Sequence, residues 1–213
     1  MKTEALIVVD YQNDFAKPGG ALYVSGGETI GEAVSLEISR VKNRTKAGSG
    51  IVIASFDWHP AVHASFASTF GIPPFSTKDG EMKWPDHCVA GTEGSKSPFI
   101  PRADGGWQNE ADSFDYRIYK GFEAESDSYS AFGGFEKPDA GSRSLDRLLK
   151  ETNVKAVRIV GLALDYCVGA TALDAKKLGY DAEIILSATR SVNPESEKAM
   201  VAKLLEAGVK LTK

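Results

Sequence analysis

Cys167 is the residue of this chain whose type and position best suit nucleophilic chemistry. It follows a strongly apolar segment and stands at the start of a helical pattern. At a helix N-terminus, unpaired N–H groups and the helix dipole lower a thiol pKa and favour the thiolate. The same N–H groups can stabilise the oxyanion of an acyl tetrahedral intermediate. The alternative is an inert cysteine buried in the core.

Asp10 and Lys120 also stand at the ends of apolar segments. A carboxylate after the apolar run from Ala5 to Val9 is costly unless it is hydrogen-bonded, paired or functional. Asp10 could accept the thiol proton, and Lys120 would then hold Asp10 ionised. A helix-capping aspartate and a solvated lysine are the alternatives.

A second group of residues suits a metal ion, because all 3 histidines lie in two short motifs, Asp57-Trp58-His59-Pro60 with His63, and Trp84-Pro85-Asp86-His87. Histidine and carboxylate ligands suit Zn, Fe or Mn, and a set of three ligands leaves positions open. Asp57, His59 and His87 are the preferred ligands, since Asp57 ends a strand and His59 can face the same way two residues later. His63 is a possible fourth ligand, an outer hydrogen-bond partner of the ligands, or a residue that binds the loop.

Three aromatic residues, Phe15, Trp84 and Tyr129, lie close in sequence to these candidates, and a flat ring could stack between such side chains. Core packing is the alternative. Cys88 adjoins His87 but is expected to be a buried structural residue.

Apolar segments that suit strands alternate with segments of helical pattern. The expected strands are Glu4–Asp10, Gly50–Asp57, Asp115–Lys120, Lys155–Leu164, Asp181–Ser187 and Gly208–Thr212, and the expected helices are Glu28–Lys46, Ser142–Glu151, Tyr166 or Cys167 to Leu178, and Pro194–Ala207. Near-continuous Val, Ile and Leu in the strands predicts an α/β fold whose parallel sheet is covered by helices on both faces.

The catalytic and metal candidates should meet at one edge of this sheet. Asp10, Asp57 and Lys120 each close an expected strand, and Cys167 lies just beyond another. Ligands of open α/β sheets bind at the carboxyl ends of the strands. Residues 64–109, rich in Pro, Gly, Ser and Trp, are interpreted as functional loops inserted into a single domain that spans 1–213.

Composition excludes several classes of partner. The chain has 213 residues, 42% of them hydrophobic, and a net charge of -4, without a basic stripe for nucleic acid. It has no apolar run long enough to span a membrane and no secretory signal, so a cytoplasmic protein is expected. Its 2 cysteines are too few for a disulfide framework. A small-molecule substrate is the expected partner.

Five motifs, in order along most of the chain, together resemble the nicotinamidase family of the isochorismatase-like cysteine hydrolases. They are Val9-Asp10-Tyr11-Gln12-Asn13-Asp14-Phe15, Asp57-Trp58-His59-Pro60 with His63 and Ser65-Phe66-Ala67, Trp84-Pro85-Asp86-His87-Cys88-Val89, Lys120-Gly121, and Gly161-Leu162-Ala163-Leu164-Asp165-Tyr166-Cys167-Val168. The resemblance implies a three-layer sandwich with a mostly parallel six-stranded sheet. It also implies a hydrolase that converts nicotinamide and water to nicotinate and ammonia in NAD salvage, and that accepts pyrazinamide.

The resemblance also assigns roles to residues. Asp10, Lys120 and Cys167 would form the catalytic triad, and a thioester would form on the cysteine. Asp57, His59 and His87 would bind a divalent metal, foremost Zn with Fe or Mn as alternatives, that receives the pyridine nitrogen. Phe15 and Trp84 would flank the ring, and Tyr129 would help to wall the pocket.

A cis peptide bond between Leu162 and Ala163 is a further implication, which would turn the Ala163 N–H toward the oxyanion beside that of Cys167. The chain departs from many relatives at Leu164, where they carry Thr, so a hydroxyl contact there is absent. Relatives are often oligomeric, which makes a homo-oligomer possible. The competing interpretations are a cysteine amidase for another small amide and a non-catalytic ligand-binding protein of the same fold.

Overall fold

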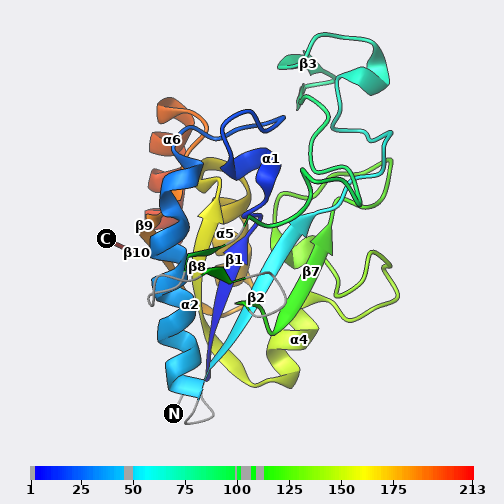
Figure 1. Ribbon diagram of the computed structural model, residues 1–213. Coiled ribbons are helices and arrows are strands. Elements are labelled where there is room, and N and C mark those ends of the chain that lie inside the picture. The colour runs from blue at the N-terminus through cyan, green and yellow to red at the C-terminus, as the bar shows by residue number, and fades with distance from the viewer. Residues whose placement is uncertain (1–2, 46–49, 99, 102–106, 109–112) are drawn as a thin grey trace.

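A parallel sheet forms the centre of the molecule (Figure 1). The computed structural model describes residues 3–45, 50–98, 100–101, 107–108 and 113–213. The six strands of the sheet are β1 (Thr3–Val9), β2 (Gly50–Asp57), β7 (Tyr116–Lys120), β8 (Val154–Leu162), β9 (Asp181–Arg190) and β10 (Lys210–Thr212). They lie in the order β10-β9-β8-β1-β2-β7, and every neighbouring pair is parallel. The expected six-stranded parallel sheet is confirmed.

Helices cover both faces of the sheet and bury two apolar layers. They are α2 (Gly31–Thr45), preceded by the 3-10 turn η1 (Gly27–Ile30), on one face, and α4 (Leu145–Glu151), α5 (Gly169–Lys177) and α6 (Pro194–Glu206) on the other. Alternate residues of β1 enter the two layers: Ile7 and Val9 pack with α4 and α5, whereas Leu6 and Val8 pack with α2. The near-continuous apolar strands are therefore explained by burial on both sides.

Capping residues set where two of these helices begin. The Ser144 side chain accepts a hydrogen bond from the Arg147 N–H at the start of α4, which begins at Leu145, three residues after the predicted start at Ser142. Asn193 caps α6 in the same way, and Pro194 occupies the first turn as expected. The sequence pattern located both helices, and the caps fix their first residues.

The segment that carries the cysteine differs from the expected helix. A π-helical turn, η4 (Leu164–Val168), comes first, and α5 begins only at Gly169. Cys167 therefore lies inside a wide turn rather than in the first turn of a regular α-helix. Wide turns of this kind are frequent at functional sites.

The described part of the 64–109 insertion contains short elements that the sequence analysis did not predict. They are the 3-10 turn η2 (Ser68–Phe70) and the strands β3 (Ser76–Lys78), β4 (Glu81–Lys83), β5 (Ile100–Pro101) and β6 (Trp107–Gln108). Asp79 and Gly80, with φ of 54° and 84°, form the turn between β3 and β4. Asp-Gly is a strong hairpin signal, so the sequence did contain the cue. In Figure 1 the β3 region stands away from the sheet.

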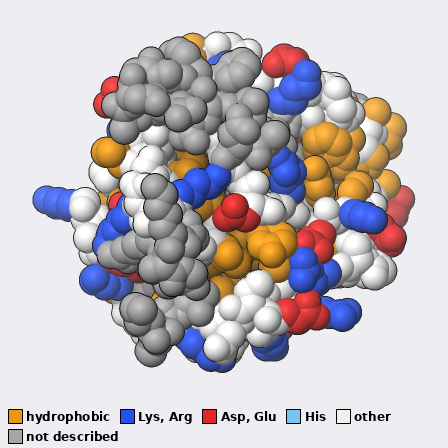
Figure 2. Space-filling model, turned by 60° about the horizontal axis from the view of Figure 1, so that its bottom comes forward, with side chains coloured by type: hydrophobic (Ala, Val, Ile, Leu, Met, Phe, Trp, Pro, Cys, Tyr) orange, Lys and Arg blue, Asp and Glu red, His pale blue; other side chains and the backbone are white. Residues whose placement is uncertain are grey.

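Two short helical segments outside the insertion were also not predicted, α1 (Asn13–Ala16) after β1 and the 3-10 turn η3 (Ala131–Gly133) after β7. No helix within the described ranges is long and apolar enough to cross a membrane. Figure 2 views the bottom of the molecule, away from the carboxyl ends of the central strands, and there side chains of both charges are interspersed with apolar ones.

Candidate active site

The ends of neighbouring strands bring the candidate residues together. Asp57 and Lys120 are the last residues of β2 and β7 and are paired in register across the two strands. Asp10 follows β1 directly, one residue beyond the strand, in the left-handed region with φ of 45°. Cys167 follows β8 in the η4 turn. The expected meeting of these residues at the carboxyl edge of the sheet is observed.

Asp10 is completely buried, and its two carboxylate oxygens have different partners. Oδ1 accepts a 2.6 Å hydrogen bond from the Ser55 hydroxyl. Oδ2 lies 3.0 Å from Nζ of Lys120 as an ion pair. Burial raises the pKa of Asp10, and although Lys120 opposes this, the nearby Asp57 carboxylate raises it further. Asp10 is therefore a buried carboxylate that the hydrogen bond to Oδ1 holds in one orientation and that can take up a proton.

Lys120 connects the two groups of candidate residues, which the sequence analysis did not predict. Its ammonium contacts Asp10, the Oδ1 atom of Asp57, and the Ser128 carbonyl oxygen at 2.9 Å. It also lies 3.6 Å from Sγ of Cys167. Burial alone would lower the pKa of Lys120, but the carboxylates of Asp10 and Asp57 raise it well above its usual value. Lys120 is therefore a permanent positive charge between two carboxylates.

The protonation of Cys167 differs from the expectation. Burial raises the pKa of its thiol well above the usual value, and Lys120 only partly offsets that effect. The predicted lowering at a helix N-terminus is wrong for this site, because the thiol is buried beside two carboxylates. Suitable atoms of Cys167, Asp10 and Asp57 all lie within 4.8 Å of one another. A protonated thiol thus stands next to a carboxylate that can act as its base.

The backbone before Cys167 contains the expected cis peptide bond. The peptide bond between Leu162 and Ala163 is cis. Leu162, Ala163 and Cys167 line the same cavity. The role of the Ala163 and Cys167 N–H groups as an oxyanion hole remains a prediction.

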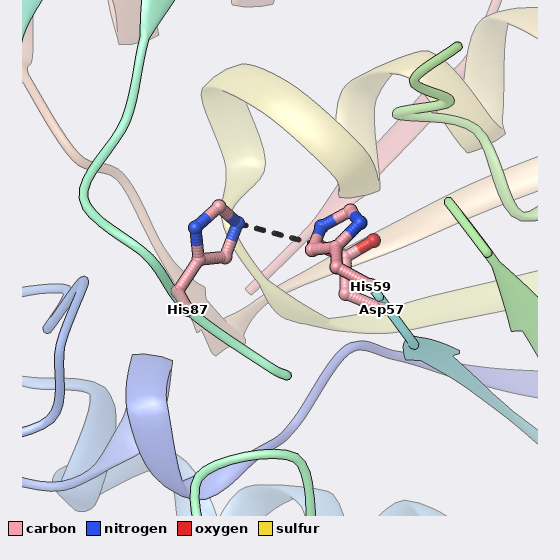
Figure 3. A group of neighbouring side chains, drawn as sticks. All are labelled: Asp57, His59 and His87. Atoms are coloured by element: carbon pink, nitrogen blue, oxygen red, sulfur yellow. Dashed lines mark ion pairs between the residues drawn. The ribbon is translucent and has the colours of Figure 1, made fainter. Parts of the chain in front are cut away.

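Asp57, His59 and His87 present three acceptor atoms to one another (Figure 3). Oδ2 of Asp57 lies 3.7 Å from Nε2 of His59 and 3.9 Å from Nε2 of His87, too far for hydrogen bonds. The other ring nitrogens are engaged: Nδ1 of His59 lies 2.7 Å from the Gly121 carbonyl oxygen, and Nδ1 of His87 lies 2.7 Å from that of Pro85. A carbonyl oxygen only accepts, so each Nδ1 carries a proton, and in the neutral form of each ring Nε2 presents a lone pair.

This arrangement fits a divalent cation. Histidine ligands typically donate their second ring N–H to a carbonyl or carboxylate, as both do here. Burial raises the pKa of Asp57, but Lys120 and His59 outweigh burial and hold it well below its usual range. Burial lowers the pKa of His87, whereas Asp57 raises that of His59 against the effect of burial. An ionised carboxylate and a neutral imidazole are the forms that bind metals.

His63 and Cys88 have other partners, although the ring of His63 lies 4.2 Å from that of His59. His63 is buried, with Nδ1 2.7 Å from Oγ of Ser65 and Nε2 3.1 Å from the Ser126 carbonyl oxygen. Of the three alternatives for His63, this geometry corresponds to binding the loop. Cys88 is completely buried, and its backbone N–H donates to the Asp14 carboxylate. It has the structural environment that was expected.

The predicted aromatic residues line one cavity with Cys167 and with two of the metal candidates, Asp57 and His87. Phe15 and Trp84 are buried, whereas Tyr129 is 41% exposed, and the Trp84 Nε1–H donates a 3.3 Å hydrogen bond to the Tyr129 hydroxyl. The lining residues are Phe15, Leu22, Val24, Asp57, Trp84, His87, Asp127, Tyr129, Leu162, Ala163, Tyr166, Cys167 and Val192. Several of these residues were not predicted from the sequence, and of them Tyr166 had a signal, its position beside Cys167.

Buried polar residues that support the site were also missed. Ser55 binds Asp10, as described above. The Gln12 side chain accepts from the Asp57 N–H at 2.9 Å and donates to the carbonyl oxygens of Asp57 and Ser95, both at 2.8 Å. Gln12 belongs to the first motif of the resemblance, which was its only signal.

In comparison with known proteins, one family matches the part of the chain that contains all the site residues described above. The model of the isochorismatase domain matches residues 4–213. The chain is 38% identical over 198 residues to the nicotinamidase of Escherichia coli, covering 91% of this chain and 85% of that protein.

Solved structures share the architecture. An Acinetobacter baumanii nicotinamidase and pyrazinamidase superposes with a TM-score of 0.82 at 32% identity, covering 100% of this chain and 97% of that one. The pyrazinamidase of Pyrococcus horikoshii in complex with zinc gives a TM-score of 0.74 at 32% identity, covering 99% and 98%.

Proposed function

Because the chain belongs to the isochorismatase family, we propose that it is a nicotinamidase, a metal-assisted cysteine amidohydrolase that converts nicotinamide and water to nicotinate and ammonia. Pyrazinamide, which differs by one ring nitrogen, should also be a substrate. The family model matches nearly the whole chain, which supports one domain with an insertion at about 64–109.

One observation carries this proposal: Lys120 contacts the carboxylates of both groups, that of Asp10 beside the thiol and that of Asp57 beside the histidines. Cys167 also lines one cavity with two of the proposed metal ligands, Asp57 and His87. That cavity also has apolar and aromatic walls. Such a site suits a small flat ring that carries an amide at one edge and a coordinating atom at another.

The first half of the reaction forms a thioester. Asp10 takes the proton of the Cys167 thiol as the sulfur attacks the carboxamide carbon, so the resting thiol need not be ionised. Asp10 then returns the proton to the amide nitrogen, the C–N bond breaks, and ammonia leaves. Lys120 stays protonated throughout and offsets the charge of the two carboxylates.

The second half consumes water. Asp10 takes a proton from a water molecule whose oxygen attacks the thioester carbon, and the C–S bond breaks as the proton returns to sulfur. The backbone N–H groups of Ala163 and Cys167 are the proposed donors to the oxyanion in both halves. Phe15, Trp84 and Tyr129 hold the ring in a position that presents the carboxamide to sulfur.

Asp57, His59 and His87 are the proposed ligands of a divalent cation. Zinc is the proposed ion, supported by the zinc complex of the Pyrococcus horikoshii relative, and Fe or Mn also suit one carboxylate and two imidazoles. When bound, the cation supplies a Lewis-acid position for the ring nitrogen of the substrate. His63 supports the neighbouring loop.

Substitution of the nucleophile tests the covalent step. Cys167→Ala should abolish ammonia release from nicotinamide while the metal content of the purified protein stays unchanged. Cys88→Ala is the matched control, because Cys88 is buried and is not among the residues that line the cavity. Appreciable hydrolysis by Cys167→Ala would contradict a thioester mechanism.

A comparison of substrates tests the specificity. Ammonia release from nicotinamide and pyrazinamide, but not from carbamoylsarcosine, is the expected result. Release from carbamoylsarcosine but not from nicotinamide or pyrazinamide would identify a cysteine amidase for another small amide. No release from any of them by the metal-loaded protein would favour a ligand-binding protein of this fold.

A further inference from the structure

Asp165 is a buried acidic residue that the proposed chemistry does not use. It lies two residues before Cys167 in the η4 turn and is 6% exposed. Its Oδ1 accepts a 2.9 Å hydrogen bond from the Val192 N–H. Its Oδ2 accepts from the Asn193 N–H at 3.1 Å and from the Ser196 hydroxyl at 2.5 Å. One carboxylate thus joins the nucleophile turn to a segment nearly thirty residues later.

The partners of Asp165 lie at the N-terminal end of α6, where a carboxylate is favoured. The first N–H groups of a helix have no partner within the helix, and its dipole is positive at that end. The charge of Asp165 therefore strengthens its three hydrogen bonds. The link is directional, because moving the η4 turn relative to α6 would break them.

Close packing at Gly169, four residues after Asp165, also holds this part of the chain against α6. A Cβ atom added to Gly169 would lie 2.6 Å from the Leu164 carbonyl oxygen and 2.6 Å from Sδ of Met200 in α6. The start of α5 therefore packs closely against the Met200 side chain of α6, and its own backbone leaves no room for a Cβ atom at Gly169. The η4 turn is held against α6 on both sides of Cys167.

The other end of the link reaches the cavity. Val192, whose N–H Asp165 accepts, lines the same cavity as Cys167. We infer that Asp165 is a positioning residue that holds the Cys167 turn and the Val192 wall of the pocket in one arrangement. The inference deepens the proposed function and rests on it for the choice of substrate.

Asp165→Asn is the direct test. The amide keeps the size of the side chain but has a single acceptor oxygen, and its NH2 group would meet donors. The expected result is a kcat for nicotinamide lowered by about 10- to 100-fold, the size of effect that a misplacement of about 1 Å produces. A several-fold rise of KM should accompany it, because Val192 also moves.

Asn193→Ala is the matched control. It removes the side-chain cap that accepts from the Glu195 N–H at 2.7 Å but leaves the Asn193 N–H on Asp165. Both variants should lower the melting temperature, and only Asp165→Asn should change kcat and KM. Equal kinetic effects in the two variants, or none in Asp165→Asn, would overturn the inference and leave Asp165 as a cap of α6 alone.

Two further measurements keep the test decisive. If Asp165→Asn does not fold, Ser196→Ala removes one of the three hydrogen bonds and should still lower kcat several-fold, whereas an unchanged kcat would overturn the inference. Crystal structures of the variants should show the distance from Sγ of Cys167 to Nζ of Lys120, 3.6 Å here, altered in Asp165→Asn or Ser196→Ala but not in Asn193→Ala. Because the distance involves no substrate, it tests the positioning even if nicotinamide is not hydrolysed.

Discussion

The hydroxyl of Ser55 donates a 2.6 Å hydrogen bond to Oδ1 of Asp10. Ser55 is buried in β2, and the Asp10 N–H in turn bonds to the Ser55 carbonyl oxygen at 3.1 Å. The bond holds one oxygen of the proposed base and leaves Oδ2 directed to Lys120.

Ser55→Ala should therefore slow the reaction without removing any reacting group. A hydrogen bond to a charged partner contributes about 1.5–3 kcal/mol, so kcat should fall by roughly 10- to 100-fold with little change in KM. Ser55→Thr keeps the hydroxyl and should retain more activity than the alanine variant. Steady-state kinetics with nicotinamide check this, and equal losses in the two variants would assign the effect to packing.

On the acidic side of the pH profile, activity should be lost at a higher pH than an ordinary aspartate would give. The proposed base must be ionised, so activity is present above the pKa of Asp10 and is lost as the pH falls through it. Burial raises that pKa above the ordinary 3.8, and the Ser55 hydrogen bond lowers it. The kcat/KM of the wild type should thus decline below a pH higher than 3.8, and that of Ser55→Ala below a still higher one. Profiles from about pH 4 to 8 test this.

The sequence predicted the meeting of Asp57 and Lys120 at one edge but not their contact. The prediction depended only on strand ends, because parallel strands place their carboxyl ends on the same edge. The contact depends on strand order and register, which put Asp57 and Lys120 on paired positions of β2 and β7. Neither is contained in the periodicity of a single segment.

The rest of the site depends on environment or on distant segments. The pKa of Cys167 followed burial rather than the helix end, and burial is a property of the packed structure. Ser55 and Asp165 are ordinary residue types whose partners lie 45 and 27 residues away. Val192 enters the pocket through the packing of α6, and its sequence neighbourhood carries no sign of that.

Lys120→Met should destabilise the protein as well as inactivate it. The variant leaves the buried carboxylates of Asp10 and Asp57 without their shared cation, and an unpaired buried charge costs about 3–5 kcal/mol. Lys96→Met is the control, because the exposed Lys96 pairs with the exposed Glu93 at 2.8 Å and its loss should cost at most about 1 kcal/mol. Urea unfolding of the metal-loaded proteins measures both, and similar losses would mean that Lys120 is not the essential counter-charge.

His87→Ala and His63→Ala should separate metal ligands from loop residues. Nε2 of His87 faces Oδ2 of Asp57, whereas both ring nitrogens of His63 have partners in the loops, Ser65 and Ser126. His87→Ala should therefore lower the affinity for zinc by more than the roughly 10- to 100-fold that loss of an outer partner costs.

His63→Ala should retain stoichiometric metal after dialysis against a weak chelator, and its main effect should be a lower melting temperature. Metal analysis together with thermal unfolding measures both properties. Removal of the metal from the wild type should abolish nicotinamide hydrolysis, and zinc should restore it. If His63→Ala loses metal as readily as His87→Ala, His63 must leave its loop partners and join the ligand set, since its ring lies only 4.2 Å from that of His59.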